Sequence, residues 1–359
     1  MARYAITIIT IAAITLATSC RLSPASTELT VLTYNTHLFE GSRAVILGVA
    51  SAAFKNKFFI FDDEKRAEKM LYKIVESRAD IVALQEVWAD GNQVWFCRQL
   101  KSVYPYCFVS GQKEDWKDRK KTGYLNTCGL VLLSKYKFIG EPKFFEFDRS
   151  KFSETFLGVH TEEEYYARKG VITATVELRP GGPTIRLGIS QTATGHDMEN
   201  VDAEVIMART TRDETGGSFI DSPAIMMGDF NVHAHWKGQF DMLKTTLSKY
   251  DAVDAYREVH PCDSEERMSE DDYTIDRQNN VLHQMFFQQS ADLKLDRDRI
   301  DYVFFKKSGG GLELTPVEAE VLRDWKYEAV WKKRVNLLAD LSDHYPVKVK
   351  FKLTRTTTP

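Results

Sequence analysis

Apolar and polar side chains alternate along the chain with two distinct periods. Eight runs are continuously apolar or alternate with a period of two, which predicts strands buried on both faces or on one. Four segments carry apolar residues at helical spacing, for example Met70, Leu71 and Ile74. The predicted strands cover 29–39, 80–88, 128–138, 170–178, 184–190, 223–230, 298–306 and 344–353, and the predicted helices cover 62–79, 91–104, 202–214 and 235–250.

The order of these elements predicts an α/β protein. Long buried strands outnumber the helices, which favours a four-layer sandwich of two stacked mixed β-sheets with helices on the outer faces. The tetrapeptide Pro-Gly-Gly-Pro at 180–183 predicts a hairpin turn between two strands. The polar stretch from Asp263 to Asp298 predicts a long loop or an insertion, and nothing in the pattern marks a second domain.

The first twenty residues differ from the rest of the chain. Arg3 is followed by an apolar stretch that is shorter than a membrane span of ~20 residues and is typical of a signal peptide. Small residues before Cys20 resemble a bacterial lipoprotein cleavage site, although Leu16 lies one place further from the cysteine than is usual. Lipidation at Cys20, plain secretion and an uncleaved anchor are three alternatives, and all of them place the protein outside the cytoplasm. We assign 1–20 to a signal peptide, 21–28 to a linker, 29–353 to one domain and 354–359 to a tail.

The composition narrows the class of protein. The 359 residues are 43% hydrophobic and 28% charged, so the chain can bury a core and is not a disordered polymer. A net charge of -3 counts against a nonspecific nuclease, whose affinity depends on neutralising phosphates. Within the domain, the spacing of the cysteines does not match a zinc site. One disulfide, two disulfides or four buried thiols are all compatible with Cys97, Cys107, Cys128 and Cys262.

Candidate chemistry gathers at the ends of the predicted strands. One such residue is ordinary turn chemistry, but five polar strand ends in one chain are a poor match to independent turns. Strand ends on one rim of a sheet can converge, so a shared site is the better interpretation. These residues are Asn35, Glu86, Asp229 with Asn231, Asp301, and Asp343 with His344.

The motifs that contain these residues resemble one family. Tyr-Asn at 34–35, Leu-Gln-Glu-Val at 84–87, Gly-Asp-Phe-Asn at 228–231, Arg-Ile-Asp-Tyr-Val-Phe at 299–304 and Ser-Asp-His-Tyr-Pro-Val at 342–347 occur in this order. Together they are similar to the endonuclease/exonuclease/phosphatase superfamily over 29–353. The segments 128–138 and 167–178, with Lys169-Gly170, and Asp340–Val347 most resemble the sphingomyelinase C branch.

This resemblance implies a metal-dependent phosphodiesterase with a single Mg²⁺. A hard divalent cation suits a reaction that builds negative charge on phosphoryl oxygens, and oxygen ligands suit Mg²⁺. Glu86 is the expected principal ligand, Asn35 completes or orients the ligand shell, and Asp343 approaches the metal.

The same resemblance assigns the groups that handle the water. His344 is the expected general base, because an imidazole pKa can lie near the working pH. Asp301 fixes its tautomer, as a carboxylate does in Ser-His-Asp sites. Asp229 and Asn231 orient the water and hold phosphoryl oxygens.

One position departs from the family pattern. The family carries a Thr-His pair at the end of the strand at 184–190, where the histidine serves the leaving group. The aligned position here is Thr192, preceded by Gln191, and a threonine cannot deliver a proton near neutral pH. We hypothesise that His196 substitutes. Alternatives are a metal-bound water in this role and a weak or inactive site.

Other histidines and two aromatic stretches are less informative. His37 follows Asn35 by two residues on the same strand-end face, so contact with substrate is one interpretation, and a loop histidine is the simpler one. His233 and His235 have spacing that could suit a metal, but no third ligand lies nearby in sequence, so a second metal is not favoured. Phe54–Phe61 and Asp324–Lys333, with Trp325 and Trp331, combine aromatic rings with lysines, as interfacial anchors do, but helix or core packing is the simpler interpretation.

The sequence therefore predicts an exported, Mg²⁺-dependent phosphodiesterase that acts on a phospholipid of the sphingomyelin type. The expected partner is a phospholipid or membrane surface, and nucleic acid is disfavoured by the acidic balance. An exported nuclease with the same fold and a catalytically silent surface-binding relative are the alternatives. The oligomeric state is left open.

Overall fold

The computed structural model has its strands in two large sheets and three small ribbons. It describes residues 28–39, 62–110, 128–150, 155–156, 159–160, 167–194, 198–212, 222–262, 264–265, 268–286, 297–331 and 334–356. The predicted signal peptide, the linker up to residue 27 and the Phe54–Phe61 stretch lie outside these residues.

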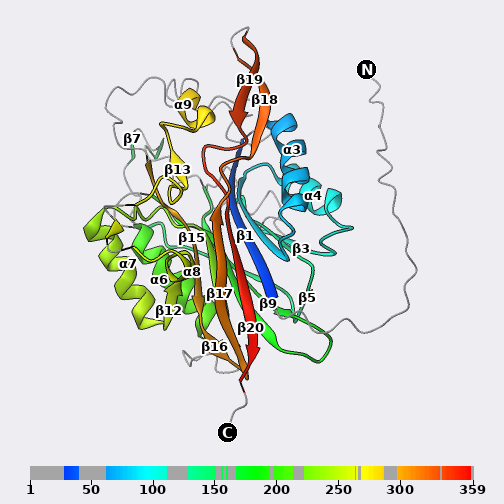
Figure 1. The fold of residues 1–359 in the computed structure, drawn as a ribbon, viewed down its shortest axis with the longest axis vertical. Coiled ribbons are helices and arrows are strands. Elements are labelled where there is room, and N and C mark those ends of the chain that lie inside the picture. Colours follow the sequence, from blue (N-terminus) through cyan, green and yellow to red (C-terminus); the bar gives the residue numbers. More distant parts are fainter. Residues whose placement is uncertain are drawn as a thin grey trace.

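The first sheet has the order β16-β17-β20-β1-β2-β4-β3 (Figure 1). In it β1 and β2 are parallel and the other pairs are antiparallel, so the sheet is mixed. Its strands are β1 (Glu28–Leu38), β2 (Ile81–Val87), β3 (Tyr106–Val109), β4 (Val131–Ser134), β16 (Ser308–Gly309), β17 (Leu312–Val321) and β20 (Val347–Arg355).

The second sheet has the order β12-β15-β11-β10-β9-β5, and β6 also pairs with β9. Here β10 and β11 are parallel and the other pairs are antiparallel. Its strands are β5 (Lys137–Phe138), β6 (Lys143–Glu146), β9 (Gly170–Glu177), β10 (Thr184–Gln191), β11 (Ala224–Asp229), β12 (Ala252–Asp254) and β15 (Asp301–Lys306).

The remaining elements cover the sheets or extend from them. The ribbons pair β7 (Thr155–Phe156) with β8 (Val159–His160), β13 (Ile275–Asp276) with β14 (Arg297–Asp298), and β18 (Lys326–Trp331) with β19 (Arg334–Asp340). The helices are α3 (Asp63–Glu76), α4 (Asp90–Gln99), α6 (Met198–Thr211), α7 (Lys237–Lys249), α8 (Ala255–Val259) and α9 (Val281–Phe286).

Three apolar clusters define the predicted four layers. The central cluster lies between the sheets, where Val31 and Ile81 of the first sheet and Leu187 and Ile225 of the second are all fully buried. A second cluster joins the first sheet to α3 and α4, and a third joins the second sheet to α6 and α7. Figure 1 shows the two helix pairs on opposite sides of the strands. The α/β sandwich of two mixed sheets is therefore confirmed.

The structure corrects several predicted boundaries. The strand predicted at 128–138 is two strands, β4 in the first sheet and β5 in the second, because the chain crosses between sheets at Lys135 and Tyr136. The segment 298–306 is likewise divided into β14 and β15. The polar stretch 263–298 contains β13 and α9, and β17 was not predicted at all. Thr354 and Arg355 belong to β20 rather than to a tail, because they pair with Glu313 and Leu312.

The four cysteines among the described residues form one disulfide and leave two thiols. Cys97 at the end of α4 is bonded to Cys107 in β3. Cys128 is a buried thiol, and Cys262 is a partly buried thiol. Of the alternatives that the sequence leaves open, the structure shows one disulfide.

Candidate active site

The inward-facing positions of several strands change from apolar to polar at one end of the sandwich. In β10, Leu187 and Ile189 lie in the central core and Gln191 follows on the same face. In β11, Ile225 and Met227 are followed in the same way by Asp229. The predicted strand-end residues therefore do converge, at the polar end of the space between the two sheets.

The register of three neighbouring strands places three polar side chains in one row. Gln191 pairs with Asp229 across β10 and β11, and Asp229 pairs with Asp301 across β11 and β15. Residues directly opposite one another on adjacent strands point to the same face of a sheet. The second sheet therefore presents an amide and two carboxylates toward the first sheet.

Two carboxylates and two amides link the sheets at this end. Asn35 Nδ2, from the first sheet, donates to Glu86 Oε1 at 3.0 Å and to Asp229 Oδ2 at 2.9 Å. Gln191 Nε2, from the second sheet, donates to the same two oxygens at 2.7 and 3.3 Å. We call Asn35, Glu86, Gln191 and Asp229 the amide–carboxylate cluster. Each carboxylate thus receives hydrogen bonds from both sheets.

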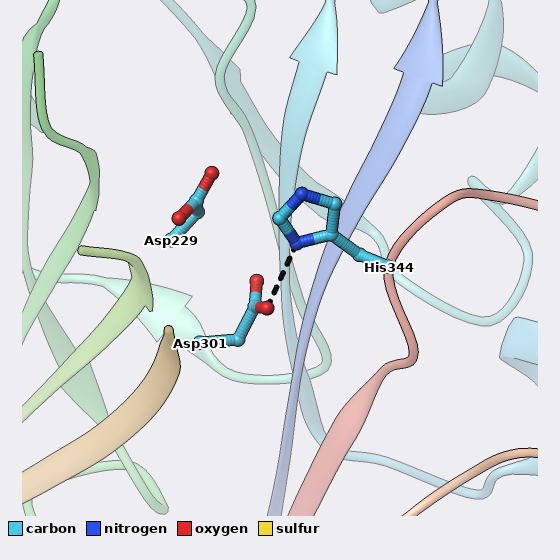
Figure 2. Close-up of side chains that lie close together, drawn as sticks. All are labelled: Asp229, Asp301 and His344. Carbon is cyan, nitrogen blue, oxygen red and sulfur yellow. Dashed lines mark hydrogen bonds and ion pairs between the residues drawn. The ribbon is translucent and has the colours of Figure 1, made fainter. Parts of the chain in front are cut away.

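A histidine and an aspartate form a second group beside this cluster. His344 Nδ1 lies 2.8 Å from Asp301 Oδ2, and both side chains are buried. Figure 2 shows the imidazole of His344 and the carboxylate of Asp229 on the same side of Asp301. The hydrogen bond places the proton on Nδ1 and leaves Nε2 as an acceptor, which is the orientation that a general base requires.

Burial of several acids in one place shifts their proton affinities. Burial raises the pKa of Asp229 to about 7, and the charges of Asp301 and Glu86 add to this effect against the opposing charges of His344 and Lys169. Burial lowers the pKa of His344, but Asp301, Asp343 and Asp229 outweigh it and hold the pKa well above its ordinary value. The cluster therefore has an excess of negative charge that attracts a cation or a proton.

His37 lies in β1 beside the amide–carboxylate cluster, so the prediction of a loop histidine was wrong. Its Nδ1 is 3.5 Å from Glu86 Oε2 and 3.3 Å from Asp343 Oδ2. Burial would raise the pKa of Glu86, but the hydrogen bond and charge of His37, with the hydrogen bond from Asn35, hold it well below its usual range. Similarly, burial would raise the pKa of Asp343, but the charges of His37 and His344 lower it.

The backbone at the strand ends adopts left-handed conformations. His37, Glu86 and Asn231 have φ angles of 50°, 56° and 50°. Such angles are uncommon outside glycine, and they turn the chain so that consecutive side chains face the cluster. At Gly228, whose φ is 155°, an added Cβ would lie 1.9 Å from the Ser190 carbonyl oxygen, so only glycine fits before Asp229.

A buried arginine secures the end of β1. Arg66 of α3 donates to the carbonyl oxygens of Thr36, His37 and Leu341 at 3.2, 2.6 and 2.8 Å. Its guanidinium also pairs with Asp63, whose other oxygen accepts from the Phe39 N–H. This pair connects the end of β1 to the segment that leads to Asp343 and His344.

The side chains that follow β10 and β11 bond to nearby carbonyl oxygens. The Thr192 hydroxyl donates to the Phe230 carbonyl oxygen and so does not face the carboxylates. Gln191 faces them instead, and sequence reasoning missed it although it obeys the same strand-end rule. Asn231 Nδ2 and Lys169 Nζ both donate to the Thr192 carbonyl oxygen, at 3.1 and 2.9 Å. His196 lies outside the described residues.

His233 and His235 lie after the Asp-Phe-Asn motif and share one carboxylate. Their Nδ1 atoms are 2.8 and 2.5 Å from Asp298 Oδ2, and the side chain of Asp298 is fully buried. The ring of His233 stacks on Trp236 with centroids 4.0 Å apart. These contacts give both histidines a structural role beside β14.

Oxygen atoms of the amide–carboxylate cluster and of the neighbouring Asp301 fit a hard divalent cation. Within the part of the chain that the structure describes, one group of three His, Cys, Asp or Glu side chains has its ligand atoms all within 4.8 Å of one another. Its members are Asp229, Asp301 and His344. Gln191 Oε1 and Asp301 Oδ1 are buried oxygens without a hydrogen-bond partner among the described residues. Carboxylate and amide oxygens of this kind suit Mg²⁺. His37 Nδ1 lies near both Glu86 and Asp343, and the approach of Asp343 to the metal stays a prediction.

Comparison with known proteins identifies the fold. A model of the endonuclease/exonuclease/phosphatase family matches residues 32–344. A search of curated proteins found no match. Sphingomyelinase C from Streptomyces griseocarneus is 18% identical, with a TM-score of 0.58 over 90% of this chain and 99% of that chain.

Two further solved structures show how widely this fold is used. A mutant beta toxin from Staphylococcus aureus with bound magnesium ions is 14% identical, with a TM-score of 0.59 over 92% of this chain and 100% of that chain. D. rerio TDP2 complexed with single strand DNA product is 16% identical, with a TM-score of 0.53 over 90% and 98% of the two chains. The fold is therefore shared by a protein named for a lipid substrate and by a protein solved with a DNA product. The fold alone does not determine the substrate.

Proposed function

Because the chain belongs to the endonuclease/exonuclease/phosphatase family, whose members are phosphoesterase hydrolases, we propose that it is an Mg²⁺-dependent phosphodiesterase acting on a sphingomyelin-type phospholipid. The observation that supports this most is the convergence of Glu86, Asp229, Asp301 and His344 at one end of the two sheets. The products would be a neutral lipid and a phosphorylated headgroup.

The cation is assigned to the amide–carboxylate cluster. Glu86 and Asp229 provide the carboxylate oxygens, and Asn35 orients both through its amide. When bound there, Mg²⁺ supplies positive charge that offsets these carboxylates and the charge that develops on the phosphoryl oxygens. Asp343 supports the cluster through His37 and the Ser342 hydroxyl.

His344 and Asp301 handle the proton of the attacking water. Asp301 holds the Nδ1 proton of His344. Once the charge of bound Mg²⁺ offsets the acids that raise the pKa of His344, Nε2 of the neutral imidazole can accept the proton of a water that attacks phosphorus. The backbone N–H of Asn231 donates to Asp229 Oδ1 at 3.0 Å and keeps that carboxylate in place. Asp229 then orients the water, and the Gln191 amide holds Glu86 and Asp229 in place through its two N–H groups.

A lipid substrate is favoured by an element that extends from the fold beside the site. The hairpin of β18 and β19 projects at one end of the molecule (Figure 1) and leads directly into Asp343 and His344. Leu338 of this hairpin is 58% exposed. Trp325 is not an anchor, because it is buried against Tyr34 with ring centroids 5.1 Å apart. We assign membrane contact to the hairpin rather than to Trp325.

An exported location fits the same function. The Cys97–Cys107 disulfide is of a kind that persists in oxidising compartments. Among the described residues, no helix has the length and apolar character needed to cross a membrane. Lipidation at Cys20 would hold the enzyme at the envelope surface.

A substrate panel tests the proposal. Wild-type protein and His344→Ala are incubated with sphingomyelin vesicles, phosphatidylcholine vesicles, plasmid DNA and a chromogenic phosphodiester, each with Mg²⁺ or with a chelator. We expect wild-type protein with Mg²⁺ to release the sphingomyelin headgroup, and the chelator or His344→Ala to abolish it. Cleavage of DNA alone would make the protein a nuclease. Inertness toward every substrate would make it a binding protein.

A further inference from the structure

Thr274 lies in the polar stretch that the sequence predicts as a loop, yet it is completely buried. Its hydroxyl oxygen accepts from the backbone N–H groups of Ile300 and Asp301, at 3.0 and 3.2 Å. Its carbonyl oxygen accepts from the Tyr345 N–H at 2.7 Å. The next residue, Ile275, forms an isolated bridge with His344. Thr274 is therefore bonded to the backbone beside both members of the Asp301–His344 pair.

The pair depends on this backbone placement because few other contacts hold the Asp301 carboxylate. Its Oδ2 contacts His344, whereas Oδ1 is buried with no hydrogen-bond partner among the described residues. A hydroxyl has two acceptor lone pairs, so the single Thr274 oxygen can satisfy both N–H groups. Valine has almost the same shape but would leave both donors buried and unpaired.

The same segment is fixed a second time close to His344. Asn280 Nδ2 donates to the Ser342 carbonyl oxygen at 2.9 Å, and the Val281 N–H donates to Asp340 Oδ2 at 2.7 Å. The segment 274–281 therefore connects the start of β15 to the segment 340–345. These two parts of the chain carry Asp301 and His344 and are separated by 43 residues.

We propose that Thr274 is a positioning residue for the Asp301–His344 pair, and that its hydroxyl sets the alignment on which turnover depends. This inference rests on the proposed function, since it assigns the pair to a hydrolytic step. Thr274 does not face the substrate, so its loss should reduce kcat and leave KM nearly unchanged. A misplacement of about 1 Å at such a pair can cost roughly 10²-fold in rate.

The test compares Thr274→Val with Thr274→Ser, which keeps the hydroxyl. The first measurement is kcat and KM on any phosphodiester that the wild-type protein hydrolyses. The second is the low-field proton NMR resonance of the imidazole Nδ1–H in the absence of substrate. We expect Thr274→Val to lose about 30- to 100-fold in kcat and to lose or shift the resonance. Thr274→Ser should retain both.

Thr210→Val is the matched control, because Thr210 is also fully buried and, among the described residues, its hydroxyl donates to the Ile206 carbonyl oxygen within α6 and to no other element. If Thr274→Val does not fold, Thr274→Cys replaces it, since a thiol is a poor acceptor of the same shape as serine. An unchanged kcat and resonance in Thr274→Val would overturn the proposal. So would equal losses in Thr274→Ser or in Thr210→Val.

The two measurements separate this inference from the proposed function. If the wild-type protein hydrolyses no phosphodiester, the proposed function fails. The resonance would still show whether Thr274 aligns the pair. If the wild-type enzyme is active but Thr274→Val leaves the resonance and kcat unchanged, only the positioning role is wrong.

Discussion

The strands β11 and β15 each pass through two buried regions that differ in chemistry. In the central core, Ile225 and Met227 of β11 face Val303 and Phe305 of β15 with no polar side chain between them. At the end of the same faces, Asp229 and Asp301 are just as deeply buried, at 1% exposure each. The two regions share strands, register and burial, and differ only in what is buried.

The two regions contribute to stability with opposite signs. Each fully buried aliphatic side chain in the core stabilises the fold by roughly 1.5–3 kcal/mol. Burying a carboxylate costs free energy, and this burial, with the nearby charges of Asp301 and Glu86, raises the pKa of Asp229 to about 7. The regular core therefore sustains a strand end that would not be stable alone. The predictions below test this division between stability and activity.

The largest effect is expected for His344→Ala, which removes the assigned base. Turnover should fall by about 10³-fold, because general base catalysis is lost while the cluster of acids is kept. The thermal midpoint should also fall, because the buried Asp301 carboxylate loses its partner. Asp301→Asn is the companion variant, and it should also lower turnover because the Nδ1 proton loses its acceptor. Retention of more than a tenth of the turnover in His344→Ala would contradict the assigned role.

In the core, Leu187→Ala should show the opposite result. Removal of a fully buried leucine should lower the free energy of unfolding by about 3 kcal/mol, measured by urea denaturation. The turnover of the folded enzyme should stay at the wild-type value, because Leu187 lies in the central core, four residues before Gln191. Leu338→Ala, at an exposed position, is the control and should change stability by less than about 0.5 kcal/mol. A large loss of turnover in Leu187→Ala would show that the two regions are not separable.

The Cys97–Cys107 disulfide lies outside both the central core and the polar strand ends, and it provides a third comparison. Cys97→Ser opens a disulfide between residues 10 apart, which should cost about 2–3 kcal/mol of unfolding free energy in oxidising buffer. In reducing buffer the variant and the wild type should unfold at the same urea concentration. Activity should be unaffected in both buffers. A difference that persists under reducing conditions would mean that the side chain contributes by packing.

The smallest effect is expected for Asp229→Asn in metal-free protein, and it is the one variant expected to raise the free energy of unfolding. A raised pKa means that the folded state binds the proton more tightly, so stability falls as pH rises from about 4 to about 7. A pKa shift of that size lowers the free energy of unfolding by roughly 4 kcal/mol above pH 7. We expect Asp229→Asn to regain about half of this loss. Unfolding curves at pH 4 and pH 8 should converge at the lower pH and separate at the higher. Equal stability at both would show that this carboxylate carries no burial cost.

The polar strand ends were visible in the sequence because a local rule marks them. An apolar run that stops at a carboxylate or amide is evident without any structure, as at Glu86 and Asp229. The two mixed sheets also followed from the lengths and periods of the apolar runs. The same rule applies to Gln191 at the end of β10. The sequence analysis instead named the next residue, Thr192, because it occupies the position of the family's histidine.

Some features could not follow from the sequence because they depend on contacts between distant residues. The division of 128–138 between two sheets is set by which neighbours each half finds, and both halves have the same strand pattern. The position of His37 between Glu86 and Asp343 results from a left-handed turn at the end of β1, which no apolar period indicates.

The sequence by itself thus determined the layers and the kinds of group at the strand ends, since side-chain period and residue type are local properties. Only the tertiary structure decided which of those groups touch. Asn35 and Asp229 are 194 residues apart and meet because two sheets stack. Thr274 meets both Asp301 and Tyr345 because a long loop folds back over the strand ends. Hydrogen bonds of this kind depend on angles and distances that are fixed when the layers pack, and these are not encoded in any single segment.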